Sequence, residues 1–188
     1  NLVITARQES YGGQAYTSAR ILTRGKFTTS YGKIEASIQL PWGQGIWPAF
    51  WMLGDNFSTL GWPDCGEIDI MEYRGQEVMT VLGTVHGPGY SGSNGVGTEY
   101  DLVQDRFDTG FHTFTLEWGD DYLKWYVDGV LFQTLIPESL PGEWVFDHPF
   151  YIILNVAVGG NFVGSPNQYT VFPQTMLIDY VRVYRELP

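Results

Sequence analysis

The sequence is poor in cysteine, in basic residues and in long apolar runs. Among its 188 residues Cys65 is the only cysteine, which excludes an internal disulfide framework and a cysteine-based zinc cluster. Ten basic residues stand against 21 acidic ones, for a net charge of −11, and so acidic a chain is repelled by nucleic-acid phosphates and by anionic membranes. No apolar run approaches the roughly 18 residues of a membrane span. We therefore expect no nucleic-acid or membrane partner.

Glycine and aromatic residues are abundant instead. Twenty-three glycines against six alanines favour turns over helices, and 44% hydrophobic residues are enough for a sizeable core. The length and the absence of any linker or charge block predict a single domain over residues 1–188. We expect strands over residues 34–40, 113–118, 122–127, 130–135, 150–158 and 176–184, and a short helical or irregular turn over 137–141. These elements predict an all-β fold, either a β-sandwich or a barrel.

The most informative segment is Gly66–Tyr73, in which three carboxylates interrupt an apolar, strand-like run. Glu67 and Asp69 share one face of a regular strand, whereas Glu72 has the opposite parity. A β-bulge at Ile70-Met71 would return Glu72 to the acidic face and leave the two glutamate carboxyl groups roughly 5–7 Å apart. A retaining glycosidase needs about 5–5.5 Å between a nucleophile and an acid/base. The segment therefore favours glycoside hydrolysis, with Asp69 modulating its neighbours through a shared proton.

Two other interpretations of the carboxylates stay open. The segment is also compatible with the solvated face of an edge strand that has no function. The three side chains are alternatively ligands for a divalent cation, since carboxylates supply oxygen ligands. Carboxylates on one strand form a line, however, whereas cation shells draw ligands from several directions.

Aromatic residues cluster just before the acidic segment. Sugar rings pack on aromatic planes, and Trp47 and Trp62 have proline and glycine neighbours that place them near strand ends, so both are candidates for a carbohydrate surface. Trp51 and Trp125 are assigned to the core. His86 ends a strand before a glycine-rich loop, where it can hydrogen-bond a sugar or an acidic side chain, or be structural.

Ordered motifs over nearly the whole chain resemble one known family. They are Thr17–Ile21, Tyr31–Ala36, Gly45–Leu53, Gly61–Pro63 leading into Gly66–Glu72, Thr84–Gly87, Tyr126–Gly129 and Asp179–Tyr184. In these segments the chain resembles glycoside hydrolase family sixteen, specifically its laminarinase-like endo-β-1,3-glucanases. With the extra residue Met71, the segment Glu67–Glu72 resembles the bulged strand of laminarinases, agarases and carrageenases.

The resemblance implies a jelly-roll β-sandwich of two curved antiparallel sheets, with a polysaccharide in a concave cleft, and retaining hydrolysis of internal β-1,3-glucan linkages. It implies Glu67 as nucleophile, Glu72 as acid/base and Asp69 as the assisting carboxylate. The positions that match sugar-subsite residues are Arg20, Trp47, Trp62 and His86. The alternatives are an agarase, a mixed-linkage β-1,3/1,4-glucanase, or a sandwich that binds glycan without cutting it.

The chain also departs from the family pattern. Family domains begin with a further segment before the stretch matching residues 1–6, and we expect the strands, subsite residue and part of a cation site that it supplies to be missing here. Asp179 fits half of that site and is the candidate ligand for a structural calcium ion, although no cofactor is required. Phe162 stands where relatives often carry tryptophan, which puts affinity at one subsite in doubt.

We expect a monomer for an intact domain, and an extracellular location because polymeric glucans are too large to enter a cell. The chain itself shows no signal-peptide pattern.

Overall fold

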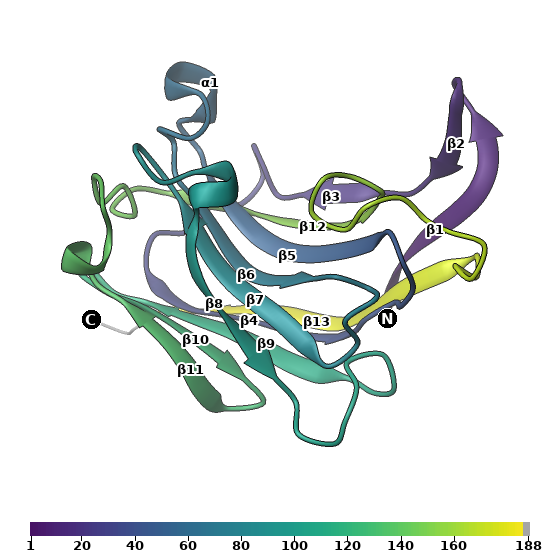
Figure 1. The fold of residues 1–188 in the computed structure, drawn as a ribbon. Coiled ribbons are helices and arrows are strands. Elements are labelled where there is room, and N and C mark those ends of the chain that lie inside the picture. The colour runs from purple at the N-terminus through teal and green to yellow at the C-terminus, as the bar shows by residue number, and fades with distance from the viewer. Residues whose placement is uncertain (186–188) are drawn as a thin grey trace.

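Two antiparallel sheets pack face to face in the computed structural model, which describes residues 1–185 (Figure 1). The seven-stranded sheet contains, in spatial order, β11 (Val130–Leu135), β10 (Leu123–Val127), β9 (His112–Trp118), β4 (Gly32–Gln39), β13 (Gln174–Tyr184), β1 (Leu2–Tyr11) and β2 (Gln14–Thr17). The six-stranded sheet contains, in order, β3 (Arg20–Leu22), β12 (Phe150–Val158), β5 (Ile46–Gly54), β6 (Glu67–Tyr73), β7 (Thr80–His86) and β8 (Val96–Asp101). The all-β sandwich prediction is confirmed, and a barrel is excluded.

Helical structure is confined to three short pieces in the described residues: α1 (Phe57–Leu60) and the 3₁₀ turns η1 (Gly92–Asn94) and η2 (Pro137–Ser139). The last of these confirms the turn predicted over residues 137–141. The predicted hairpin is also present, because Val127 pairs with Val130 across Asp128 and Gly129. Both turn residues have positive φ, 49° and 79°, as a two-residue hairpin turn requires.

The core lies between the sheets and follows the two-residue period of the strands. In β5, Phe50 and Met52 are fully buried in this core, so Trp47 and Trp51 point to the outer face of the six-stranded sheet. The side chains of β12 also alternate between the two faces of its sheet. Phe150, Ile152, Leu154 and Val156 face the core, and Tyr151 and Ile153 are buried on the outer face, so the strand is a long apolar run.

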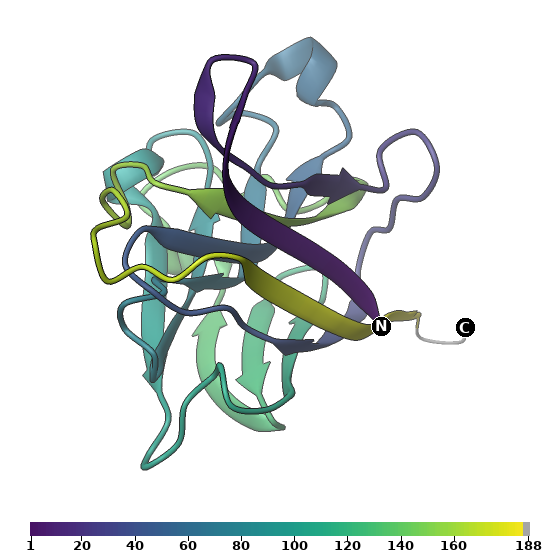
Figure 2. The same cartoon turned by 90° about the vertical axis from the view of Figure 1, so that its right-hand side faces the viewer.

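The outer face of the six-stranded sheet is flanked by two projecting segments. In Figure 1 the segment with α1 rises at the upper left and the β1–β2 hairpin at the upper right. The first half of β1 pairs with β13, and its second half pairs only with β2, so the strand leaves its sheet midway. Figure 2 shows this strand rising past the six-stranded sheet, so that the hairpin stands on the same side as α1. The outer face between them carries the polar residues described next.

Candidate active site

The acidic segment forms β6, which lies between β5 and β7 in the interior of its sheet. Register against both neighbours shifts between Asp69 and Glu72, so that Asp69 lies opposite Thr84 and Glu72 opposite Leu82. The predicted bulge at Ile70-Met71 is therefore confirmed. Ile70 and Met71 are both buried in the core, and Glu67, Asp69 and Glu72 share the outer face. A solvated edge strand, the alternative with no function, is excluded by this interior position.

Two groups on the inner side hold the bulge in place. The indole of Trp125, which is fully buried as predicted, donates a hydrogen bond of 2.9 Å to the backbone carbonyl of Asp69. Gly83 stands in β7 between the partners of Asp69 and Glu72, and a Cβ there would collide with the Trp125 ring. The glycine is thus required by a close approach, and the tryptophan that fills the space fixes the backbone between the carboxylates.

The three carboxyl groups lie in a site from which water is largely excluded. Asp69 is only 3% exposed, and burial together with the charge of Glu72 raises its pKa well above the ordinary value. Burial raises the pKa of Glu67 to about 8, with Asp69 adding to the effect, and burial raises that of Glu72 as well. Crowded acids that share little water cannot all ionise together. The site therefore retains a proton near neutral pH, which general acid catalysis requires.

His86 lies opposite Glu67 in the register between β6 and β7. Its Nε2 atom is 3.3 Å from Asp69 Oδ2 and 3.7 Å from Glu67 Oε1. The imidazole therefore lies close to both of these carboxylates. A positive charge on the ring lowers the pKa of Glu67, against the effect of burial.

Each glutamate has its own tryptophan. Trp47 Nε1 donates to Glu72 Oε1 at 3.0 Å, and this bond lowers the pKa of Glu72. The Trp62 side chain lies close enough to Glu67 to lower the pKa of that carboxyl group. The Trp62 ring is exposed and its centroid lies 6.0 Å from that of His86, so an apolar surface is available beside Glu67. Both predicted tryptophans thus lie at the carboxylates.

Phe162 extends the aromatic surface beside Glu72. Its ring centroid is 5.0 Å from that of Trp47. The Phe162 ring also contacts the Arg74 guanidinium, which lies 4.4 Å from the ring centroid. The phenyl ring therefore occupies the place next to Trp47 without an indole N–H. Unlike a tryptophan at this position, Phe162 offers no hydrogen-bond donor.

Arg20 belongs to a polar group farther along the sheet. It pairs in register with Asn155 of β12, and its guanidinium lies 5.2 Å from the centroid of Trp51, whose Nε1 donates to Asn155 Oδ1 at 2.8 Å. The assignment of Trp51 to the core is wrong, because its parity in β5 places it, half-buried, on the outer face.

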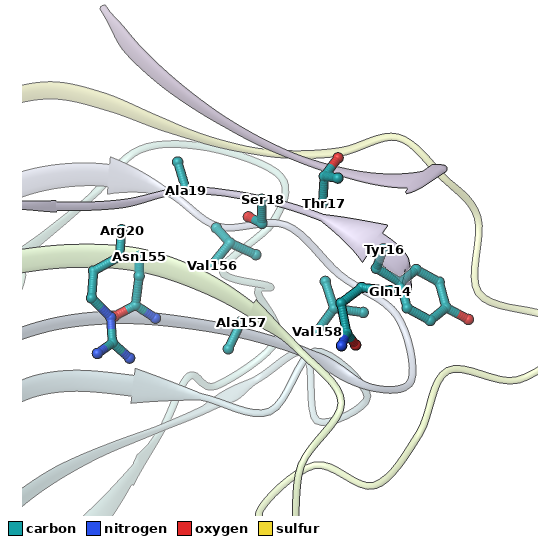
Figure 3. Close-up of a pocket in the computed structure, with 10 residues that line it drawn as sticks. All are labelled: Gln14, Tyr16, Thr17, Ser18, Ala19, Arg20, Asn155, Val156, Ala157 and Val158. Atoms are coloured by element: carbon teal, nitrogen blue, oxygen red, sulfur yellow. The ribbon is translucent and has the colours of Figure 1, made fainter. Parts of the chain in front are cut away.

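The polar group of Arg20 and Asn155 adjoins a cavity of about 300 Å³ between β2–β3 and β12. Figure 3 shows Arg20 and Asn155 at one end of this cavity and Gln14 and Tyr16 at the other.

Asn155 is a residue that the sequence analysis did not single out. It is buried in β12 and holds Trp51 in place. The signal was available, since Asn155 is a polar side chain within an apolar run. Its partner could not be read from the run itself, because strand order decides which neighbour it meets.

The predicted cation ligand Asp179 lies elsewhere. It is exposed, and the register of β13 against β4 shifts between Ile178 and Tyr180, so Asp179 is the extra residue of a bulge. The regular alternation assumed for this strand is interrupted there. Within residues 1–185 no group of three acidic, histidine or cysteine side chains includes Asp179. Calcium also takes backbone carbonyl oxygens as ligands, and the calcium site stays a prediction.

The pKa of Glu67 predicts a pH-dependent effect of Glu67→Gln on stability. Because folding raises this pKa from 4.5 to about 8, the wild-type chain loses stability as the pH rises through that interval. The uncharged amide escapes this loss, so we expect Glu67→Gln to raise the free energy of unfolding at pH 8 by about 1–3 kcal/mol, and to leave it nearly unchanged at pH 4. Urea unfolding in EDTA measures both values. Glu138→Gln, at an exposed carboxylate, is the control, and an equal effect at both pH values would contradict the assignment.

Comparisons with known proteins find similar sequences and similar folds. The family model described as "Glycosyl hydrolases family 16" matches residues 1–182. The chain is 53% identical to the laminarinase catalytic domain from Thermotoga maritima, with a TM-score of 0.96, over 99% of this chain and 78% of that one. It is 51% identical to the endo-β-1,3-glucanase from Pyrococcus furiosus, with a TM-score of 0.93, over 97% and 73%. A "Beta-glucanase" from Rhodothermus marinus is 42% identical over 98% of this chain and 68% of its own length.

Proposed function

The chain belongs to glycosyl hydrolase family 16, and from that membership and its outer-face carboxylates we propose that it is an endo-acting, retaining β-1,3-glucanase. The observation that carries the proposal is the bulge in β6, which brings Glu67, Asp69 and Glu72 to one face. The jelly-roll sandwich predicted from the sequence agrees with the laminarinase structures it matches. Its substrate is a polysaccharide with internal β-1,3-glucosidic bonds.

In the first step a Glu67 oxygen attacks the anomeric carbon from the α face. The bond to the leaving oxygen breaks, and Glu72 transfers its proton to that oxygen. A covalent α-glycosyl ester on Glu67 results. In the second step Glu72, now a carboxylate, takes a proton from water, whose oxygen attacks the same carbon from the β face and frees Glu67. Two inversions give a β product.

The surrounding groups divide the proton between the two glutamates. Asp69, buried beside both, disfavours three simultaneous negative charges, and His86 lies within reach of Asp69 and Glu67. The indole of Trp47 holds one Glu72 oxygen, which orients the other toward the leaving group. Trp62 and Arg20 supply an apolar plane and a cationic donor for sugar rings on either side of the carboxylates.

The remaining properties follow from a polymeric substrate. A glucan chain cannot cross a cell membrane, so the protein acts outside the cell. It needs no cofactor in the chemical step, because the two glutamates supply both the nucleophile and the proton. Within residues 1–185 no helix has the length and apolar character of a membrane span.

Reducing-end release from soluble β-1,3-glucan tests the reaction, with agarose and mixed-linkage barley glucan in parallel. We expect a mixture of oligosaccharides from the first substrate at early times, because an open face admits internal bonds. Faster release from agarose or barley glucan would instead support one of the alternative hydrolases. Oligosaccharide binding with no release from any substrate would support a binding module.

Proton NMR of the first products tests the retaining mechanism. A double displacement through Glu67 yields β anomers, which mutarotate to the equilibrium mixture only later. We expect the β signal to lead during the first minutes of digestion. Initial α anomers would show that water attacks directly and that Glu67 is not a nucleophile.

A further inference from the structure

Glu67, Asp69 and His86 form a compact set of ligand atoms on β6 and β7. One oxygen of each acid and one ring nitrogen lie within 4.8 Å of one another, and no other group of three acidic, histidine or cysteine side chains gathers in this way in residues 1–185. The set comes from two strands. The three ligand atoms can therefore approach one cation from different directions, whereas the three carboxylates of β6 alone would form a line.

Two of the three distances between the ligand atoms fit the edge of a tetrahedral shell around a small cation. In a tetrahedron with metal–ligand bonds of about 2.0–2.1 Å, the ligand atoms lie about 3.3–3.4 Å from one another. His86 Nε2 is 3.3 Å from Asp69 Oδ2 and 3.7 Å from Glu67 Oε1, close to that edge length. One nitrogen and two oxygens suit Zn²⁺, whereas Ca²⁺ and Mg²⁺ prefer six or more oxygen ligands.

Asp69 supplies an unsatisfied acceptor aimed into this set. Its Oδ2 is buried and accepts no hydrogen bond from the described residues, although it is the oxygen that faces His86. An unpaired buried carboxylate oxygen is costly, and a cation beside it removes that cost. Gly95 packs directly against the His86 ring, where a Cβ would overlap it, so the imidazole is held in position before any ligand arrives.

The three ligands lie on the outer face of the six-stranded sheet, and one of them is partly exposed. The Glu67 side chain is 17% exposed, and the exposed Trp62 lies beyond it, so a water molecule has access to a cation held here. Three protein ligands and a water are the usual shell of an accessible zinc ion.

We propose that Glu67, Asp69 and His86 form a binding site for a zinc-type divalent cation, and that its occupancy blocks hydrolysis reversibly by holding the Glu67 oxygen that attacks the sugar. Only the inhibitory half rests on the proposed function. Glu72 lies outside the ligand set, so its own role in the reaction does not enter into cation binding.

Calorimetric titration of EDTA-treated, buffer-exchanged protein with ZnCl₂ tests the binding half. We expect one equivalent to bind with micromolar affinity, and Asp69→Asn and His86→Gln each to weaken binding at least about tenfold. Glu72→Gln removes the same charge from the same strand and is expected to retain binding within a few fold. His148→Gln is the control for a surface imidazole. Titration with CoCl₂ should add visible bands of four-coordinate cobalt, absent from His86→Gln.

Several results would overturn the site. The first is that the wild-type protein binds no zinc at millimolar metal. The second is that Asp69→Asn and His86→Gln bind zinc as tightly as the wild-type protein, and the third is that Glu72→Gln loses as much affinity as Asp69→Asn. In the activity arm, zinc should inhibit glucan hydrolysis and EDTA should restore it, while equal Ca²⁺ should not inhibit. Zinc binding to a protein that cuts no glucan would refute the proposed function and leave the site standing. Tight binding with full activity would refute the inhibition.

Discussion

Replacement of Glu67 by alanine is expected to lower kcat on soluble β-1,3-glucan by at least about 10³-fold, because no other group can form the covalent ester. Binding of β-1,3-gluco-oligosaccharides should change little, since Trp62, Trp47 and Arg20 remain. Reducing-end assays and calorimetric titration measure the two quantities. The fold should not suffer, because removal of Glu67 relieves its repulsion with Asp69.

Azide distinguishes loss of the nucleophile from general damage. In Glu67→Ala the small anion fits the space left by the carboxylate and attacks the anomeric carbon from the α face, while Glu72 still protonates the leaving oxygen. We expect azide to restore turnover in part and to yield an α-glycosyl azide, identified by proton NMR. Glu138→Ala, at an exposed site, is the matched control. Turnover within tenfold of wild type, or a β-glycosyl azide from Glu67→Ala, would remove Glu67 from the nucleophile role.

The acidic face was predictable because its evidence is local. Alternation along Glu67–Tyr73 puts Glu72 on the wrong face, and one extra residue is the smallest change that corrects it. The structure places that residue at Ile70-Met71 and buries both apolar side chains. The hairpin at Asp128-Gly129 was predictable for the same reason, since positive φ at both positions is a property of two adjacent residues.

Contacts between strands distant in the sequence could not be predicted in this way. Trp51 was assigned to the core because the sequence does not show which face of β5 is buried, and its hydrogen bond to Asn155 depends on β12 lying next to β5. The Trp125 contact with the Asp69 carbonyl joins opposite sheets. Asp179 was placed on a regular strand, and the bulge that interrupts β13 is set by its pairing with β4.

The structure adds an electrostatic basis for the retained proton. All three carboxyl groups have raised pKa values, so the free site holds at least one proton near neutral pH. Glu72 accepts an indole N–H on one oxygen, and a proton on the other leaves that bond intact. Positive charge on the His86 ring favours the ionised forms of both glutamates. The acid step requires the retained proton on Glu72, whose second oxygen can carry it beside the indole bond.

Replacement of Glu72 by alanine is accordingly expected to have effects that depend on the leaving group. Hydrolysis of β-1,3-glucan should fall by about 10²–10⁴-fold, because a sugar alkoxide leaves poorly without a proton. An aryl β-glucoside oligomer with an acidic phenol needs no proton to leave, so its covalent ester should still form in a fast burst. Pre-steady-state release of the phenol measures this step. Equal losses on both substrates would contradict the acid role of Glu72.

Azide completes the comparison between the two glutamates. In Glu72→Ala the ester on Glu67 forms from the aryl substrate but lacks a base to activate water. Azide needs no base, and it attacks the ester from the β face into the space that Glu72 occupied, with departure of the Glu67 carboxylate. We expect faster steady-state turnover and a β-glycosyl azide, opposite in configuration to the product from Glu67→Ala. One anion and two variants thus report which face of the sugar each carboxylate occupies, and the same configuration from both would refute the paired assignment.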